Sequence, residues 1–114
     1  MLVTVPLFDA TAIATDTTTV GSTVDLCKRA GTCVGSAATL TAYSAGDFTC
    51  AVETSLDGST WRTLVAGTVH AAAGVFFDAV GTTPPDAFRY VRASILSATS
   101  ADATVEMKLL LSHS

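Results

Sequence analysis

Apolar and polar residues alternate along several segments of this chain, and the clearest of these is residues 89–95. Val91, Ala93 and Ile95 are apolar, whereas Arg92 and Ser94 lie between them. A period of two is typical of a β-strand with one buried face, because successive side chains of a strand point to opposite sides. The segment therefore predicts a strand whose three apolar residues face inward.

The last alternating segment, residues 103–111, predicts a second strand of this kind. Its expected inward positions are Val105, Met107, Leu109 and Leu111, and its expected outward positions are Glu106 and Lys108. The arginines of residues 89–95 are then expected to pair across strands with acids such as Glu53 or Glu106.

Residues 52–65 predict a β-hairpin, because residues 57–60 (Asp-Gly-Ser-Thr) form a turn signal between two alternating runs. We expect Leu56 to lie opposite Trp61. This register groups the apolar residues on one face and makes Glu53 and Arg62 diagonal neighbours, whereas a slip of one residue would separate both sets.

Clusters of Gly, Pro, Asp and Ser divide the rest of the chain into similar short segments. The predicted strands are residues 2–8, 23–28, 36–44, 47–56, 61–69, 74–80, 88–97 and 103–111. Strands at this spacing, without a helical period, predict an all-β fold: an antiparallel β-sandwich, jelly-roll-like, of about eight short strands. Residues 1–114 are predicted to form this single domain.

Charge narrows the range of partners. Charged residues make up 14% of the chain, against roughly 25% in an average soluble domain. The net charge is −4 and the longest basic run is Lys28-Arg29, so neither a nucleic acid nor an anionic membrane is an expected partner. No apolar run approaches the ~20 residues of a membrane span. Neutral, weakly polar surface instead favours contact with other proteins.

Residues 1–8 are apolar but lack the basic residues of a signal peptide, and Thr4 and Pro6 interrupt them. We interpret this segment as a strand or an N-terminal interface arm, in a protein that folds in the cytoplasm. The candidate interface residues are Leu2, Val3, Val5, Leu7 and Phe8.

The three cysteines do not make a closed disulfide framework, because their number is odd. Cys50 alternates in phase with Phe48 and Val52, so we expect it to be a small buried hydrophobe. Cys27 and Cys33 flank a plausible tight turn and could pair outside the cell. In the cytoplasm they are expected to stay reduced.

The residues of catalysis and metal binding are sparse. His70 is expected to be an exposed strand-end residue, and neither a nucleophile-elbow motif nor a cysteine or histidine pair at metal-ligand spacing occurs. The hairpin turn accounts for Asp57 and Gly58 without an ion. We therefore expect no enzyme activity, no cofactor and no metal.

Trp61, the only tryptophan, has two interpretations. Its phase with Leu56 and Val65 favours a residue of the core or its rim. In the alternative, a carbohydrate-binding or adhesion module, it would be a platform for a sugar ring, together with Tyr43 and Tyr90.

Two motifs resemble those of small β-sandwich virion proteins of tailed bacteriophages. One is Glu53-Thr-Ser-Leu-Asp-Gly-Ser-Thr-Trp61, and the other is Phe88-Arg-Tyr-Val-Arg-Ala93, which precedes a terminal alternating strand. The resemblance covers roughly residues 36–111. It implies a structural role without catalysis, as a head decoration or cement protein or as a neck or tail-associated protein.

The first expectation from this resemblance is a capsid decoration protein that bridges shell subunits and stabilises the phage head. Its partners would be the major capsid protein or other virion subunits. It would assemble in the host cytoplasm and reside in the virion. A homo-oligomer is expected, and proteins of this kind are often trimers.

Overall fold

The computed structural model describes residues 2–26, 32–80 and 87–112, and the regular elements of these ranges are all β-strands. The strands are β1 (Leu2–Ile13), β2 (Thr18–Val20), β3 (Val24–Asp25), β4 (Thr32–Ser55), β5 (Arg62–Val65), β6 (Val69–His70), β7 (Gly74–Ala79) and β8 (Tyr90–Ser112). They pair antiparallel in one sheet. The predicted all-β antiparallel fold is confirmed.

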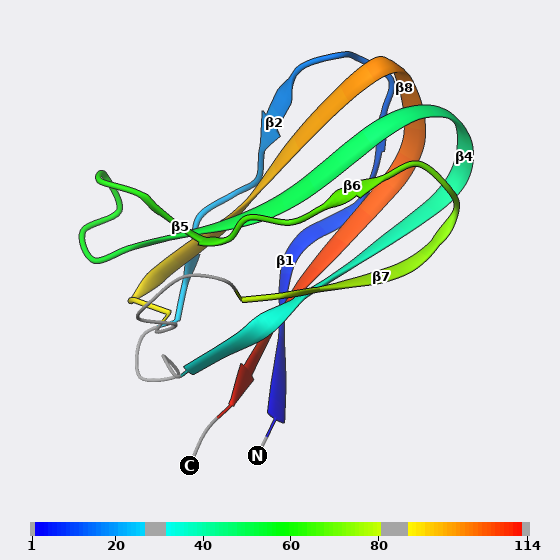
Figure 1. The fold of residues 1–114 in the computed structure, drawn as a ribbon. Helices are drawn as coiled ribbons and strands as arrows, with labels where there is room; N and C mark the ends of the chain where they lie inside the picture. The colour runs from blue at the N-terminus through cyan, green and yellow to red at the C-terminus, as the bar shows by residue number, and fades with distance from the viewer. Residues whose placement is uncertain (1, 27–31, 81–86, 113–114) are drawn as a thin grey trace.

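Two long strands, β4 and β8, form the framework of the fold. They pair along almost their whole length, from Thr32 opposite Ser112 to Ser55 opposite Tyr90, and they bend together at one end of the molecule (Figure 1). The predicted strands 36–44 and 47–56 are therefore the two halves of β4, and 88–97 and 103–111 are the two halves of β8. The prediction of separate short strands is wrong here, because the pairing of β4 with β8 resumes beyond the bend.

Unusual backbone conformations mark both bends. β4 has a positive φ at Gly46, and β8 has positive φ at Thr99 and Ser100. The carboxylate of Asp16 accepts hydrogen bonds of 2.9 Å from the backbone N–H groups of Ser100 and Ala101. These two N–H groups hold the pKa of Asp16 below its ordinary value, because they stabilise the ionised form. The segment before β2 thus stabilises the bend of β8 through these hydrogen bonds.

The bend folds the sheet over, so that its two halves form the layers of a sandwich-like fold (Figure 1). One layer contains β1, the second half of β8, the first half of β4, and β7. The other contains β2, β3, the first half of β8, the second half of β4, β5 and β6. The predicted inward residues of β8 are all buried in the core: Val91, Ala93, Ile95, Val105, Met107, Leu109 and Leu111.

The hairpin between β4 and β5 follows the predicted register only in part. Val52 lies opposite Val65 as expected, but Thr54 lies opposite Arg62. Leu64 is the additional residue of a β-bulge, and both Leu64 and Val65 are buried. The bulge shifts the register by one residue. β4 ends at Ser55, and Leu56, just beyond it, is 70% exposed instead of facing the core.

The predicted strand 61–69 is divided, because β5 ends at Val65 and β6 begins at Val69. β2 was not predicted, since Thr18–Val20 shows no apolar alternation. The predicted strand 23–28 is represented by β3. Its residues 27 and 28 lie outside the described residues.

Candidate functional site

The predicted interface segment forms the first part of β1, which pairs with the end of β8. Leu7 is buried, and Val5 and Phe8 pack against the core. Val3 is half-buried, and the side chain of Leu2 lies outside the described residues. The fold therefore accounts for the apolar character of this segment, which gives no separate argument for a contact arm.

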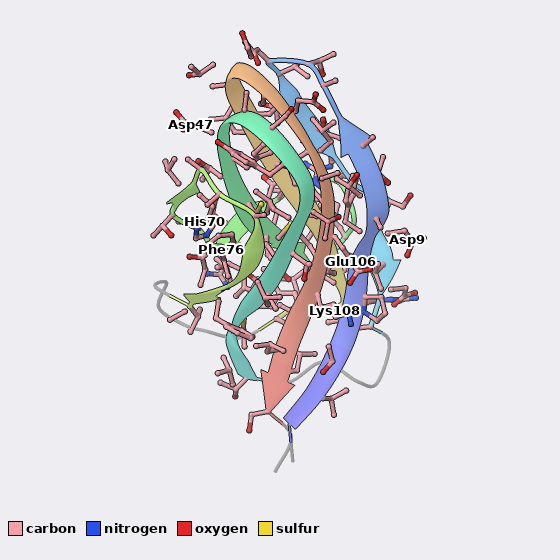
Figure 2. The ribbon with its side chains drawn as sticks, turned by 90° about the vertical axis from the view of Figure 1, so that its right-hand side faces the viewer. Asp9, Asp47, His70, Phe76, Glu106 and Lys108 are labelled. Atoms are coloured by element: carbon pink, nitrogen blue, oxygen red, sulfur yellow. The ribbon has the colours of Figure 1, made fainter. Side chains whose placement is uncertain are left out.

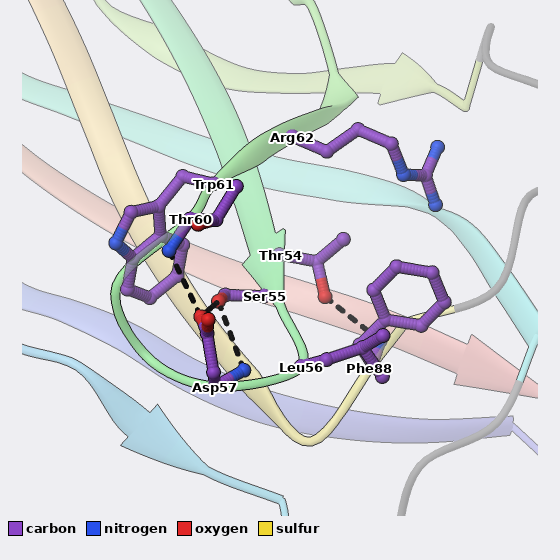
Figure 3. A pocket seen from close by; sticks show the side chains of 8 residues that line it. All are labelled: Thr54, Ser55, Leu56, Asp57, Thr60, Trp61, Arg62 and Phe88. Atoms are coloured by element: carbon purple, nitrogen blue, oxygen red, sulfur yellow. Dashed lines mark hydrogen bonds between the residues drawn. The ribbon is translucent and has the colours of Figure 1, made fainter.

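Trp61 lies beside a shallow pocket of about 220 Å³ next to the β4–β5 turn (Figure 3). The pocket is lined by Thr54, Ser55, Leu56, Asp57, Thr60, Trp61, Arg62 and Phe88. The guanidinium of Arg92 lies 4.0 Å from the centre of the Trp61 ring, and its Nε donates to Glu53 Oε1 at 2.9 Å. The expected pairing of an outward arginine with Glu53 is confirmed for Arg92. A cation covering a tryptophan face leaves less of that ring for a sugar.

Asp57 organises the turn beside this pocket. Its Oδ1 accepts hydrogen bonds from the backbone N–H groups of Ser59 and Thr60, at 2.8 and 2.9 Å, and from the Ser55 hydroxyl at 2.9 Å. Gly58 adopts a φ of 80°, which favours glycine. The turn thus accounts for both residues, as the sequence predicted. The N–H groups of Thr60 and Ser59 are the main reason that the pKa of Asp57 lies below its ordinary value of 3.8.

This lowered pKa predicts that the folded state loses part of its stability in acid. A carboxyl whose pKa is lower in the folded state stabilises the fold above its unfolded pKa, and this contribution disappears as the pH falls through the folded pKa. Asp57→Asn keeps an acceptor oxygen but does not titrate. We therefore expect its free energy of unfolding to fall less steeply than that of the wild type between about pH 5 and pH 2. Urea unfolding at a series of pH values measures this, and identical slopes would contradict it.

His70 is not the exposed strand-end residue that the sequence predicted, because its side chain is only 11% exposed. Its Nε2 lies 3.1 Å from Oδ2 of the buried Asp78, and its ring stacks on Phe76 with centroids 4.1 Å apart. Thr68 donates to Asp78 Oδ1 at 2.8 Å. His70 of β6, in one layer, thus contacts Phe76 and Asp78 of β7, in the other. Figure 2 shows His70 beside Phe76.

This His70–Asp78 cluster lacks the arrangement of a nucleophilic triad. In a triad the acid and the nucleophile contact different nitrogens of the imidazole ring. Here Asp78 and the Thr68 hydroxyl, which lies 3.4 Å away, both approach Nε2. The cluster therefore fits a structural role, in which it holds β6 and β7 together, better than a catalytic role. Sequence reasoning missed it, because the two partners lie eight residues apart.

Two thiols are buried among the described residues, Cys33 and Cys50. Burial raises the pKa of Cys33 to about 11 and that of Cys50 to about 12. The prediction that Cys50 is a small buried hydrophobe is confirmed, and Cys33 is a free thiol. Cys27 lies outside the described residues.

Among the described residues, the outer side of β7 carries the most exposed of the large apolar side chains. Phe77 is 72% exposed and Val75 is 55% exposed. Sequence reasoning predicted this strand but not its surface, although adjacent phenylalanines at 76 and 77 could have signalled it. A strand directs such neighbours to opposite faces, so that one aromatic ring must face outward.

No helix within the described ranges is long and apolar enough to cross a membrane. In the part of the chain that the structure describes, no group of three or more His, Cys, Asp and Glu residues is placed to hold a metal ion. Comparison of the chain with protein-family models, with curated proteins and with solved structures finds no match.

Proposed function

We propose that this chain is a structural protein of a virus particle, a decoration protein that binds and stabilises the head of a tailed bacteriophage. Its partners would be the major capsid protein or other virion subunits, in particles assembled in the host cytoplasm. The proposal starts from the resemblance of residues 53–61 and 88–93 to such virion proteins.

The observation that carries the proposal is the apolar outer surface of β7, where Val75 and Phe77 are exposed. These two residues are two positions apart on one strand, so their side chains are neighbours on the same face, and contiguous exposed apolar patches mark protein interaction sites. With only 14% charged residues, the chain has few groups that would need to be desolvated in such contacts.

A decoration protein can act through individually weak contacts. Many copies on one shell bind together, so that each contact needs less buried area than an isolated complex of the standard ~1,600 Å². A role at the neck or in the tail would use the same surface chemistry. A carbohydrate-binding module that uses Trp61 stays a prediction from the sequence.

Quantitative mass spectrometry of purified particles tests the proposal. Particles released from cells that carry this gene are separated into heads and tails, and copy numbers are referred to the major capsid protein. We expect many copies per particle in the head fraction. Copies found in the tail fraction alone would assign the protein to the neck or tail instead of the head. Absence of the protein from particles would contradict a virion role.

A further inference from the structure

The outer edge of β7 presents backbone groups that pair with no other strand among the described residues. The N–H of Val80 donates to the carbonyl of Val34 on β4 at 3.1 Å. In an antiparallel pair, the backbone groups of successive residues point alternately toward the partner strand and away from it. The N–H and C=O groups of Val75, Phe77 and Ala79 therefore point to the open edge.

The side chains along this edge are uncharged on the outer face. The outward residues of β7 are Val75, Phe77 and Ala79, and they lie opposite Thr39, Ala37 and Gly35 of β4. The single charged residue of the strand, Asp78, is turned inward and is held by His70 and Thr68. The nearest charges on the next strand, β8, are Glu106 and Lys108, which lie 3.9 Å apart and offset each other.

We propose that β7 pairs antiparallel with β7 of a second copy of this chain, about a two-fold axis that passes beside Phe77. In this register Phe77 lies opposite its own copy, and Val75 lies opposite Ala79 in both directions. The three outward residues of each strand then form about six backbone hydrogen bonds across the interface. The layer that contains β7 continues from one copy into the next.

A second copy fits this edge because the edge is complementary to itself. A two-fold axis places identical groups near each other, so a charged residue at its centre would lie next to the same charge of the other copy and be repelled by it. Phe77 instead forms an aromatic pair with its copy. Edge strands that avoid pairing commonly carry an outward lysine, a proline or an inward charge. β7 has neither of the first two, and its inward Asp78 is already held by His70 and Thr68.

This pairing would serve the proposed assembly role, and its biological purpose rests on that role. The contact itself can be measured on the purified chain alone. A short edge buries less area than a standard interface. We therefore expect a monomer–dimer equilibrium that depends on concentration. On a particle surface, where copies are held near each other, the same contact would be favoured.

The register can be tested by exchanging charges in sedimentation velocity experiments. Val75→Lys alone and Ala79→Glu alone should each weaken the dimer about tenfold, because each places an unpaired charge in the interface. The double variant Val75→Lys/Ala79→Glu should recover the affinity, since each lysine then faces a glutamate of the other copy. Within one strand the two positions are ~13 Å apart, too far to pair.

The matched control is Leu96→Lys, which places the same charge at a 51% exposed apolar position on the other layer. It should leave the dimer unchanged, and circular dichroism should show every variant folded. A wild type that stays monomeric at about 1 mM would overturn the pairing, even if the chain binds particles. A trimer, or a double variant no better than the single ones, would overturn it as well. Dimerisation of a chain absent from particles would support the pairing and contradict the virion role.

Discussion

Phe48→Ala is expected to lower the free energy of unfolding by about 3–5 kcal/mol, the usual cost of deleting a buried phenylalanine ring. Phe48 is completely buried and is among the largest side chains of the core. It lies just after the bend of β4, opposite Ser97 of β8 and His70 of β6. Alanine would leave a cavity that the two paired strands cannot close without shifting their register. Urea unfolding followed by circular dichroism measures the loss.

The matched control is the same substitution at Phe77, which is 72% exposed. Measured at a concentration where the chain is monomeric, Phe77→Ala should change the free energy of unfolding by no more than about 0.5 kcal/mol. Equal losses at the two positions would contradict the assignment of the inner and outer faces.

Gly46→Ala is expected to cost about 2–5 kcal/mol, because two penalties add at this bend. Gly46 has a φ of 92°, and a side chain in a left-handed conformation costs roughly 1–2 kcal/mol. A Cβ at this position would also overlap the Cα of Ala101 and lie 2.7 Å from its nitrogen, an overpacking that costs about 1–3 kcal/mol more. β4 and β8 touch too closely at the bend to admit any side chain.

Gly58→Ala separates these two penalties. Gly58 also has a positive φ, but a Cβ there would meet only the Tyr90 ring at 3.8 Å. Its cost should be the conformational part alone, about 1–2 kcal/mol. If Gly46→Ala were no more destabilising than Gly58→Ala in urea unfolding, the close approach of the two bends would be wrong.

The alternation of apolar residues predicted the faces of the strands more reliably than their lengths. Every predicted inward residue of β8 is buried, because a period of two depends only on which face meets the core. The predicted strands stop on either side of both bends, at Gly46 and at Thr99–Ser100. Locally the bends have the residues of turns, and only the long-range pairing of β4 with β8 makes each a corner within one strand.

The register of the β4–β5 hairpin shows a second limit of sequence reasoning. A bulge at Leu64 changes which residues lie opposite each other without changing the apolar pattern enough to be recognised. Leu56 is a separate departure from the prediction. β4 ends at Ser55, and Leu56, the next residue, is 70% exposed instead of facing the core.

The candidate site was the least predictable part of the chain. The sequence directed attention to residues 2–8, whose side chains largely serve the core, and to Trp61, whose ring is partly covered by Arg92. The exposed edge of β7 was not recognised as a surface. Whether an edge stays open depends on which strands flank it in the folded sheet, and local alternation contains no information about that.

Hydrogen–deuterium exchange of individual β7 amides, measured in dilute and in concentrated solutions of the wild type, tests the central claim most directly. The amides of Phe76 and Asp78 face β4 and should be protected at both concentrations. The amides of Val75, Phe77 and Ala79 should exchange rapidly in dilute solution and become protected as the concentration rises. Exchange of these three amides that stays fast at every concentration would contradict the account.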